Sequence, residues 1–251
     1  MKNHEKFTGK AQVYSKYRPN YPIEYIRYLI ESNCLCAESK IADIGSGTGI
    51  LTRQLLQEQL KVIGVEPNDE MRQIAEASLR KEANFISING TAEQTRIESS
   101  SVDLVTVAQA FHWFNPDAFK KECQRILKLD SKVALVWNSR DLNSRIVLEN
   151  AEICRNFCPN FKGFSGGIEE TPDIYAEFFR DSQYDYREFR NDLVFDLEGF
   201  IGRNLSASYA PKPDDPNYSL FIKALTEQFY RYADKEMVIF PNITKSYIGQ
   251  V

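Results

Sequence analysis

Three alternating glycines mark the stretch Asp43-Ile44-Gly45-Ser46-Gly47-Thr48-Gly49, where a buried strand predicted over residues 40–44 must turn into a helix beginning near Ile50. Glycines permit positive φ angles and allow a ligand to approach bare backbone. The start of the following helix directs unpaired N–H groups and a partial positive charge at the same place. The sequence therefore predicts a binding site for a polar or anionic ligand at this turn.

The spacing of the glycines distinguishes several kinds of nucleotide-binding turn. A dinucleotide site prefers G-x-G-x-x-G, whereas here the third glycine comes one residue early, and no lysine follows it as in a P-loop. With an aspartate two positions before the first glycine, D-x-G-x-G-x-G resembles the cofactor turn of class I S-adenosylmethionine-dependent methyltransferases. The resemblance implies S-adenosylmethionine as the cofactor, held by Asp43, Gly45, Ser46, Gly47, Thr48 and Gly49.

A second anchor is Glu66, which ends a short buried strand predicted over residues 61–66. Ligands of open parallel sheets occupy the crevice at the carboxyl ends of the strands, so Glu66 and the glycine turn should face one ligand. A carboxylate there suits two vicinal ribose hydroxyls and repels a 2'-phosphate. NAD sites share such a residue, so it indicates an adenosine ligand without choosing the cofactor. The alternative is an ordinary solvated glutamate at a strand end.

Alternating strand and helix patterns predict an α/β fold, a Rossmann-like doubly wound sheet of seven strands. The sheet should be mostly parallel, with two late strands near residues 184–197 and 237–251 forming an antiparallel hairpin edge. Helices between residues 143 and 180 are predicted as an insertion over the active site. We expect a single domain over 1–251, divided into an N-terminal lid and helix (1–36), a cofactor-binding core (37–140), and the helical insertion with the C-terminal antiparallel strands (141–251).

Composition excludes several functional classes. The chain has 251 residues and a formal net charge of −4, which disfavours nucleic acid as the main partner. No apolar run approaches membrane-spanning length, and the polar first residues lead into no signal-peptide core, so we expect a cytoplasmic protein without membrane partners. Five cysteines without paired C-x-x-C motifs, and histidines far from them in sequence, predict no metal site.

The segment Tyr14 to Pro22 resembles a Y-x-x-x-R-P-x-Y-P segment of small-molecule methyltransferases of this family, where it folds over the cofactor pocket. Tyrosine ring faces suit a sulfonium, and an arginine suits a carboxylate of the cofactor or the acceptor. We therefore predict a lid over bound cofactor, with Tyr14 and Arg18 contacting the cofactor and Tyr17 and Tyr21 the acceptor. Simple packing of aromatic rings on the sheet is the alternative.

Later strand ends carry the other predicted contacts. The resemblance implies that residues 89–93 lie beside the adenine, although many related enzymes have aspartate where this chain has Gly90. Gln-Ala-x-His-Trp, residues 109–113, resembles a stretch that lines the pocket in the branch of trans-aconitate methyltransferase-like and ubiquinone-biosynthesis-like enzymes. Further predicted cofactor contacts are Pro67, Met71, Thr91, Ala92, Glu93 and Gln109, and further acceptor contacts are His112, Trp113, Asn138 and Arg140.

Methyl transfer from a sulfonium needs little more than alignment of the reacting atoms, because proximity and orientation alone supply on the order of 7 to 11 kcal/mol. His112 is the candidate general base, with a packed histidine as the alternative. The predicted function is transfer of a methyl group from S-adenosylmethionine to a small-molecule acceptor by in-line displacement. A non-catalytic S-adenosylmethionine-binding module and, less favoured by the glycine spacing, a nicotinamide-dependent oxidoreductase are the alternatives.

Overall fold

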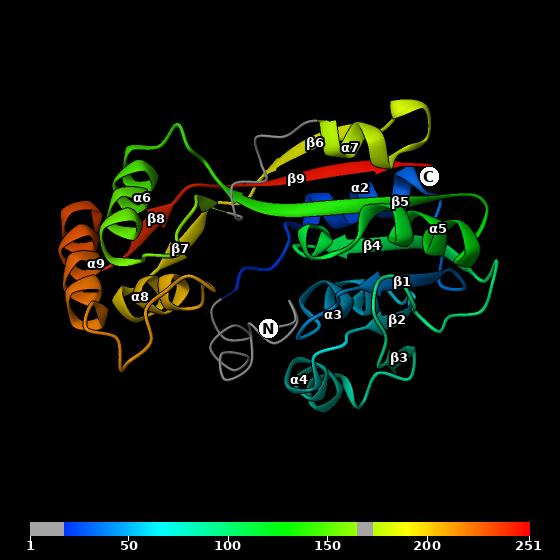
Figure 1. The fold of residues 1–251 in the computed structure, drawn as a ribbon, viewed down its shortest axis with the longest axis horizontal. Coiled ribbons are helices and arrows are strands. Elements are labelled where there is room, and N and C mark those ends of the chain that lie inside the picture. The colour runs from blue at the N-terminus through cyan, green and yellow to red at the C-terminus, as the bar shows by residue number, and fades with distance from the viewer. Residues whose placement is uncertain (1–17, 165–172) are drawn as a thin grey trace.

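A seven-stranded sheet forms the centre of the computed structural model, which describes residues 18–164 and 173–251 (Figure 1). The strand order is β3-β2-β1-β4-β5-β9-β6. Pairs among the first five of these strands are parallel, and β9 runs antiparallel to both β5 and β6. The strands are β1 (Lys40–Ile44), β2 (Lys61–Val65), β3 (Phe85–Ile88), β4 (Val102–Ala108), β5 (Leu127–Arg140), β6 (Asp185–Arg190) and β9 (Asn242–Gly249). The predicted fold class is confirmed.

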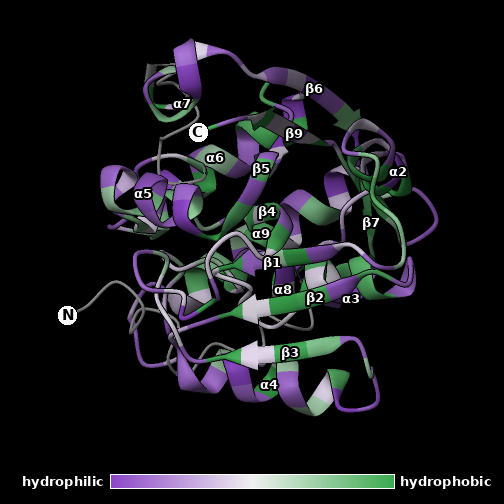
Figure 2. Ribbon diagram, turned by 90° about the vertical axis from the view of Figure 1, so that its right-hand side faces the viewer, coloured by the Kyte–Doolittle hydropathy of each residue, from purple (hydrophilic) through white to green (hydrophobic). Residues whose placement is uncertain are grey.

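Helices cover both faces of this sheet, which explains why its central strands are almost continuously apolar. On one face, α2 (Ile23–Ser32) and α3 (Ile50–Gln57) bury residues such as Tyr25 and Leu55 against the sheet. On the other face, α5 (Pro116–Ile126) and α7 (Asp173–Phe178) pack together, and the rings of Phe119 and Phe178 stack 5.6 Å apart. The strand at one edge of the sheet, β6, is hydrophilic along most of its length, as Figure 2 shows.

One crossover departs from the predicted alternation of strands and helices. Between β3 and β4, residues 89–101 contain no helix, whereas α4 (Asp69–Leu79) lies between β2 and β3 as predicted. A bridge between Thr91 and Gln94 closes a tight turn directly after Gly90. This turn places a loop, rather than a helix, beside the carboxyl ends of the strands.

A second region, here called the cap, extends from the sheet and is built around its own apolar cluster (Figure 1). Buried amides join two of its helices, because Asn150 donates to Gln228 at 3.0 Å and Gln228 donates to the Ile146 carbonyl at 2.8 Å. The sequence did not predict its two-stranded sheet. The cap consists of α6 (Arg145–Phe157), β7 (Leu193–Phe195), α8 (Leu197–Leu205), α9 (Tyr218–Tyr232) and β8 (Val238–Phe240).

The antiparallel edge of the main sheet therefore forms between strands that are distant in sequence. Residues 191–241, which supply most of the cap, intervene between β6 and β9. β5 ends and β9 begins beside the cap, with Arg140 opposite Asn242 as the pair of the ladder nearest to it. Within the described ranges, no helix has the length and apolar character needed to cross a membrane.

Candidate functional site

The glycine turn has the backbone conformation that its sequence predicts. Gly45, Gly47 and Gly49 have φ angles of 69°, 58° and 80°. A Cβ atom at Gly45 would lie 2.6 Å from the Cβ of Ala110, and one at Gly49 would lie 3.1 Å from Leu79 Cδ1. At Gly47 the nearest atom would be the Met71 sulfur at 3.9 Å. The outer glycines thus permit close packing, and Gly47 leaves space open to a ligand.

Asp43 lies beneath the turn and lines neither of the two pockets described below. Its carboxylate accepts hydrogen bonds from Thr52 at 2.6 Å and from Thr106 at 3.0 Å, which joins β1 to α3 and β4. Burial raises the pKa of Asp43 to about 6, although both threonine hydrogen bonds oppose the rise. Asp43, the acidic residue of the motif, therefore fixes the position of the strand and helix that flank the turn.

Glu66 contacts the turn directly. Oε2 accepts a hydrogen bond from the Gly47 N–H at 2.9 Å, and Oε1 accepts one from the Asn68 N–H at 2.7 Å. Burial raises the pKa of Glu66, and these two backbone hydrogen bonds partly offset that effect. Glu66 is only 7% exposed, and the two hydrogen bonds hold its carboxylate in one orientation.

These groups form the wall of a pocket at the carboxyl ends of β1, β2 and β4, here called the glycine-turn pocket. It encloses about 820 Å³, part of which is open to solvent. The residues lining it that the sequence singled out are Gly45, Gly47, Glu66, Pro67, Met71, Thr91, Ala92, Glu93, Gln109 and Trp113. Asn68, Ala108, Ala110 and Phe114 also line it and were missed. Asn68 had a recognisable signal, since it caps α4 by accepting a hydrogen bond from the Met71 N–H at 3.0 Å.

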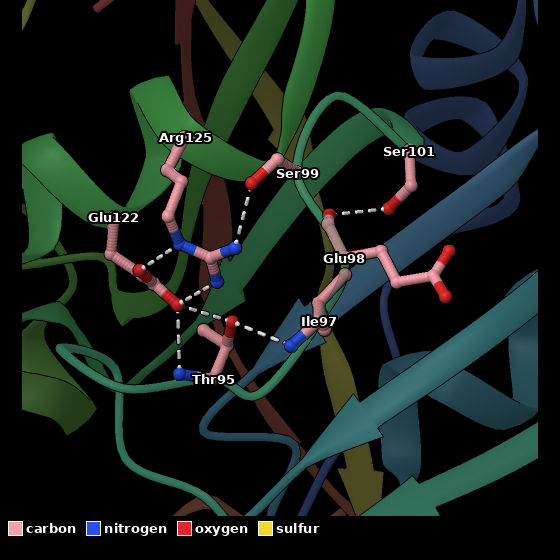
Figure 3. Close-up of polar contacts among 7 residues, drawn as sticks. All are labelled: Thr95, Ile97, Glu98, Ser99, Ser101, Glu122 and Arg125. Atoms are coloured by element: carbon pink, nitrogen blue, oxygen red, sulfur yellow. Dashed lines mark hydrogen bonds and ion pairs between the residues drawn. The ribbon is translucent and has the colours of Figure 1, made fainter.

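An ion pair between the buried Glu122 and the exposed Arg125 holds the loop that forms one side of this pocket (Figure 3). Glu122 on α5 accepts hydrogen bonds from the backbone N–H and the hydroxyl of Thr95, at 2.9 Å and 2.5 Å. Arg125 donates to both carboxylate oxygens of Glu122, and it also donates to Ser99 at 3.2 Å. The loop containing residues 91–93 is therefore fastened to α5.

Gly90 begins this loop and explains the departure from the family's aspartate. A Cβ atom at Gly90 would lie 3.0 Å from the carbonyl oxygens of both Gln94 and Thr95. A side chain would therefore disturb the turn. Glu93 lines the pocket instead, and its carboxylate accepts a hydrogen bond from the Asn115 N–H at 3.0 Å.

A second, smaller pocket adjoins the first and is here called the arginine pocket. Gln109 lines both pockets, and its side chain donates to the Asn138 carbonyl at 3.1 Å. Predicted residues that line the arginine pocket are Arg18, Tyr21, Gln109 and Asn138, and residues outside the predicted site are Pro19, Ile50 and Arg203. Arg203 lies on α8 in the cap, far in sequence from the motifs, so no local pattern indicated it.

The segment before α2 is docked where the structure describes it. The Tyr21 N–H donates to Gln54 at 2.9 Å, and Gln54 donates back to the Tyr21 carbonyl at 2.7 Å. Asn138 and Asn191 both donate to the Asn20 carbonyl, at 3.3 Å and 3.0 Å. Tyr14 and Tyr17 lie outside the described residues.

The remaining predicted residues that the structure describes do not line either pocket. His112 is packed between Trp113 and Trp137, with ring centroids at 4.3 Å and 5.2 Å. Arg140 lies at the end of β5 against the ring of Phe164. Ser46 and Thr48 belong to the turn but do not line either pocket, and Thr48 is buried.

The architecture and the glycine turn together define a class of protein. Among the described strands of the main sheet, β9 is antiparallel to its neighbours β5 and β6. The glycine turn after β1 is hydrogen-bonded to the Glu66 carboxylate after β2. This combination is the Rossmann-like fold of class I methyltransferases, with the glycine turn at the carboxyl end of β1.

Comparisons with known proteins agree with this class. Residues 42–135 match the family model of a methyltransferase domain. An uncharacterized methyltransferase of Mycobacterium tuberculosis is 37% identical over 147 residues, which cover 59% of this chain and 58% of that protein. A probable S-adenosylmethionine-dependent methyltransferase of Saccharomyces cerevisiae is 32% identical over 126 residues, 48% of this chain and 43% of that protein.

Similarity of fold extends further than similarity of sequence. The structure of a putative type II methyltransferase from Anaeromyxobacter dehalogenans superposes with a TM-score of 0.69 and 18% identity, over 93% of this chain and 98% of that one. The alignment with the mycobacterial relative, in contrast, spans little more than half of either protein. Residues 42–135 thus resemble a methyltransferase domain in sequence, and the fold of nearly the whole chain resembles that of a solved methyltransferase structure.

Proposed function

We propose that this protein transfers a methyl group from S-adenosylmethionine to a small-molecule acceptor. The observation that carries the proposal is the contact of the Glu66 carboxylate with the Gly47 N–H in the wall of the glycine-turn pocket. This contact places two groups suited to a nucleoside in the same cavity. The carboxylate can accept hydrogen bonds from ribose hydroxyls, and the open backbone turn lets the ligand approach closely.

The residues of the pocket fit an adenosine. Glu66 uses one lone pair on each oxygen for backbone N–H groups, and the other lone pairs are available to two ribose hydroxyls. Met71 and Ala92 offer apolar surface to the adenine, and both line the pocket. The open space at Gly47 allows a ligand to lie against the backbone, which a side chain would prevent.

The protein's part in the reaction is placement. When bound, S-adenosylmethionine supplies an already activated methyl group. Gln109 lies between the two pockets, so an acceptor in the arginine pocket would adjoin the cofactor. Holding the two reactants there and excluding water provides most of the rate enhancement that such a transfer requires.

His112 is the proposed general base for an acceptor that must lose a proton. Its ring packs on Trp113, and Trp113 lines the glycine-turn pocket. The variant His112→Gln should leave cofactor affinity unchanged and should flatten the pH dependence of methyl transfer. If the pH profile keeps its shape in His112→Gln, the residue serves packing alone.

Calorimetry and a labelling assay test the proposal together. S-adenosylmethionine and S-adenosylhomocysteine should bind, and NAD should not. The protein should then transfer label from methyl-labelled cofactor to a molecule in a metabolite extract from which proteins and nucleic acids have been removed. A preference for NAD would contradict the assignment, and cofactor binding without transfer of label would favour a non-catalytic binding module.

A further inference from the structure

Gln109 lies at the junction of the two pockets and has a strained backbone. It directly follows β4, lines both the glycine-turn pocket and the arginine pocket, and has a φ angle of 60°. Positive φ angles are uncommon for residues other than glycine, and they occur often at functional sites, where the surrounding structure maintains them. Here the Gln109 N–H donates to the Val136 carbonyl of β5 at 3.0 Å, which holds the residue in this conformation. The strain therefore draws attention to what the Gln109 side chain does.

The side-chain amide of Gln109 is held in one orientation. Its Nε2 donates to the backbone carbonyl of Asn138 at 3.1 Å. A carbonyl oxygen only accepts hydrogen bonds, so a flipped amide would bring two oxygens together without a hydrogen between them. The other end of the amide, Oε1, accepts no hydrogen bond from residues 18–164 and 173–251, and it is not among their buried unpaired atoms. Gln109 therefore presents an accessible oxygen where the two pockets meet.

Asn138, which anchors this amide, has its own side chain fully engaged. Its Oδ1 accepts hydrogen bonds from the Thr244 hydroxyl at 2.5 Å and from Asn191 Nδ2 at 3.1 Å. Its Nδ2 donates to the carbonyl of Asn20 at 3.3 Å and to that of Pro19 at 3.5 Å. An amide oxygen accepts two hydrogen bonds and an amide nitrogen donates two, so no group of this side chain is left for a ligand. Its part is to keep its neighbours in place.

An accessible amide oxygen at this junction selects the acceptor by its hydrogen. An acceptor atom that takes a methyl group from a sulfonium gains positive charge, and a hydrogen on that atom becomes a stronger donor. An amide oxygen that accepts this hydrogen therefore stabilises the transition state more than it stabilises the bound reactants, which is the requirement for catalysis. A carboxylate oxygen has no hydrogen to donate and would face the partial negative charge of Oε1.

We propose that Gln109 Oε1 accepts a hydrogen bond from the acceptor atom itself, and that the acceptor is therefore an O–H or N–H group and not a carboxylate. The inference rests on the proposed function, because it takes the glycine-turn pocket as the cofactor site and the arginine pocket as the acceptor site. A lone pair of the acceptor atom forms the bond to the methyl carbon, and the bond from that carbon to sulfur breaks with its electron pair left on sulfur. The positive charge passes to the acceptor atom, which then loses its proton to His112 or to water.

Sinefungin tests this hydrogen bond before the acceptor is known. The compound is an analogue with a carbon-bound amine where S-adenosylmethionine has its transferable methyl group, so its N–H groups occupy the place of the reaction. Calorimetry measures the affinity of sinefungin relative to that of S-adenosylhomocysteine, which has neither group. Gln109→Met keeps the length of the side chain and removes its amide. It should lower this affinity ratio about tenfold, as expected for loss of one hydrogen bond to a charged group, and should change S-adenosylhomocysteine affinity less than twofold.

Three further variants keep the test interpretable. Gln109→Glu keeps an accepting oxygen and loses the amide donor, so its affinity ratio should be at least that of the parent. Gln109→Ala removes the amide in a second way, should Gln109→Met fail to fold, and it should lower the ratio similarly. Gln73→Met makes the same substitution at an exposed position of α4, and it should change neither affinity.

The labelled product from the metabolite extract gives an independent measurement of the acceptor class. Mild alkali hydrolyses methyl esters and releases their label as volatile methanol, whereas methyl groups on amine nitrogens or ether oxygens remain attached. We expect label that alkali does not release. Gln109→Met should slow the formation of this product at least about tenfold, because the hydrogen bond is strongest in the transition state.

Three results would overturn the inference. Equal losses of sinefungin and S-adenosylhomocysteine affinity in Gln109→Met would assign the amide to the cofactor alone. An unchanged affinity ratio in Gln109→Met, or an equal loss in Gln109→Glu, would show that Oε1 accepts no hydrogen from the reacting group. Label that alkali releases would make the acceptor a carboxylate. A parent protein that does not bind S-adenosylhomocysteine would contradict the proposed function instead, so the two failures are distinguishable.

Discussion

The two adjoining pockets are built in different ways. The glycine-turn pocket depends on backbone conformation and on residues that directly follow strands, such as Gly47 and Glu66. The arginine pocket depends on side chains that arrive from the segment before α2, the end of β5 and a helix of the cap. The first is set by local sequence, and the second exists only after the cap has packed beside the sheet.

The largest expected effect comes from Gly47→Val, which tests the backbone construction of the first pocket. Valine at a φ of 58° is strained by roughly 1 to 2 kcal/mol, and its side chain would project into space that is otherwise open. We expect S-adenosylhomocysteine affinity to fall more than about a hundredfold, which corresponds to over roughly 2.7 kcal/mol. Calorimetry measures it, and circular dichroism checks folding. A folded variant with the parent's affinity would remove the glycine turn from the site.

Glu66→Ala should give the next largest effect. It removes charge-assisted hydrogen bonds to ribose, worth about 1.5 to 3 kcal/mol, or roughly ten- to a hundredfold in affinity. Glu58→Ala, at an exposed position after α3, is the matched control and should bind like the parent. The ribose assignment is wrong if both variants bind S-adenosylhomocysteine equally well. Because burial raises the pKa of Glu66, cofactor affinity should also decline on acidification earlier than for an ordinary glutamate.

Glu122→Gln tests whether the wall of the first pocket depends on the ion pair with Arg125. Burial would raise the pKa of Glu122, but hydrogen bonds from Arg125 and Thr95 outweigh it and lower the pKa to about 2. The folded protein thus holds this proton less tightly than the unfolded chain, whose value is 4.5. The stabilisation that ionised Glu122 contributes is therefore complete above pH 4.5 and is lost as the pH falls toward 2.

We therefore expect Glu122→Gln to lower the free energy of unfolding by about 1.5 to 3 kcal/mol at neutral pH, and the difference from the parent to shrink below pH 4.5. Urea unfolding at several pH values measures this. Glu149→Gln, which removes a more exposed carboxylate paired with Arg145 and Arg231, should cost less than about 1 kcal/mol. A constant difference across the acidic range would contradict the assignment for Glu122.

The smallest expected effect concerns the segment before α2, which lines the arginine pocket. Tyr21 is already hydrogen-bonded to Gln54, so its amide should show little change in hydrogen exchange when S-adenosylhomocysteine binds. Residues 10–18 should become protected about tenfold if the segment orders over bound cofactor as predicted. Equal exchange with and without ligand would refute the lid and favour a permanently docked arm.

The difference between the two pockets also explains which residues could be predicted from the sequence. Asp43, the glycines and Glu66 lie within one strand-helix-strand unit, so their mutual placement follows from chain geometry and could be predicted. Arg203 is 185 residues from Arg18, and only the packing of α8 beside the segment before α2 brings them together. The two-stranded sheet of the cap was missed for a related reason, since β7 and β8 are short strands separated by α8 and α9.

The two long strands that join the sheet to the cap have a mechanical consequence. Hydrogen bonding between β5 and β9 continues from Val133 opposite Gly249 to Arg140 opposite Asn242, and the Asp141 N–H donates to the Pro241 carbonyl just beyond. A paired ribbon of this length resists sharp bending at one point, unlike a loop hinge. Access to the space between cap and sheet should therefore vary through elastic twisting of the ribbon, with the cap acting as a stiff lever and small rotations at the sheet producing larger displacements at α8.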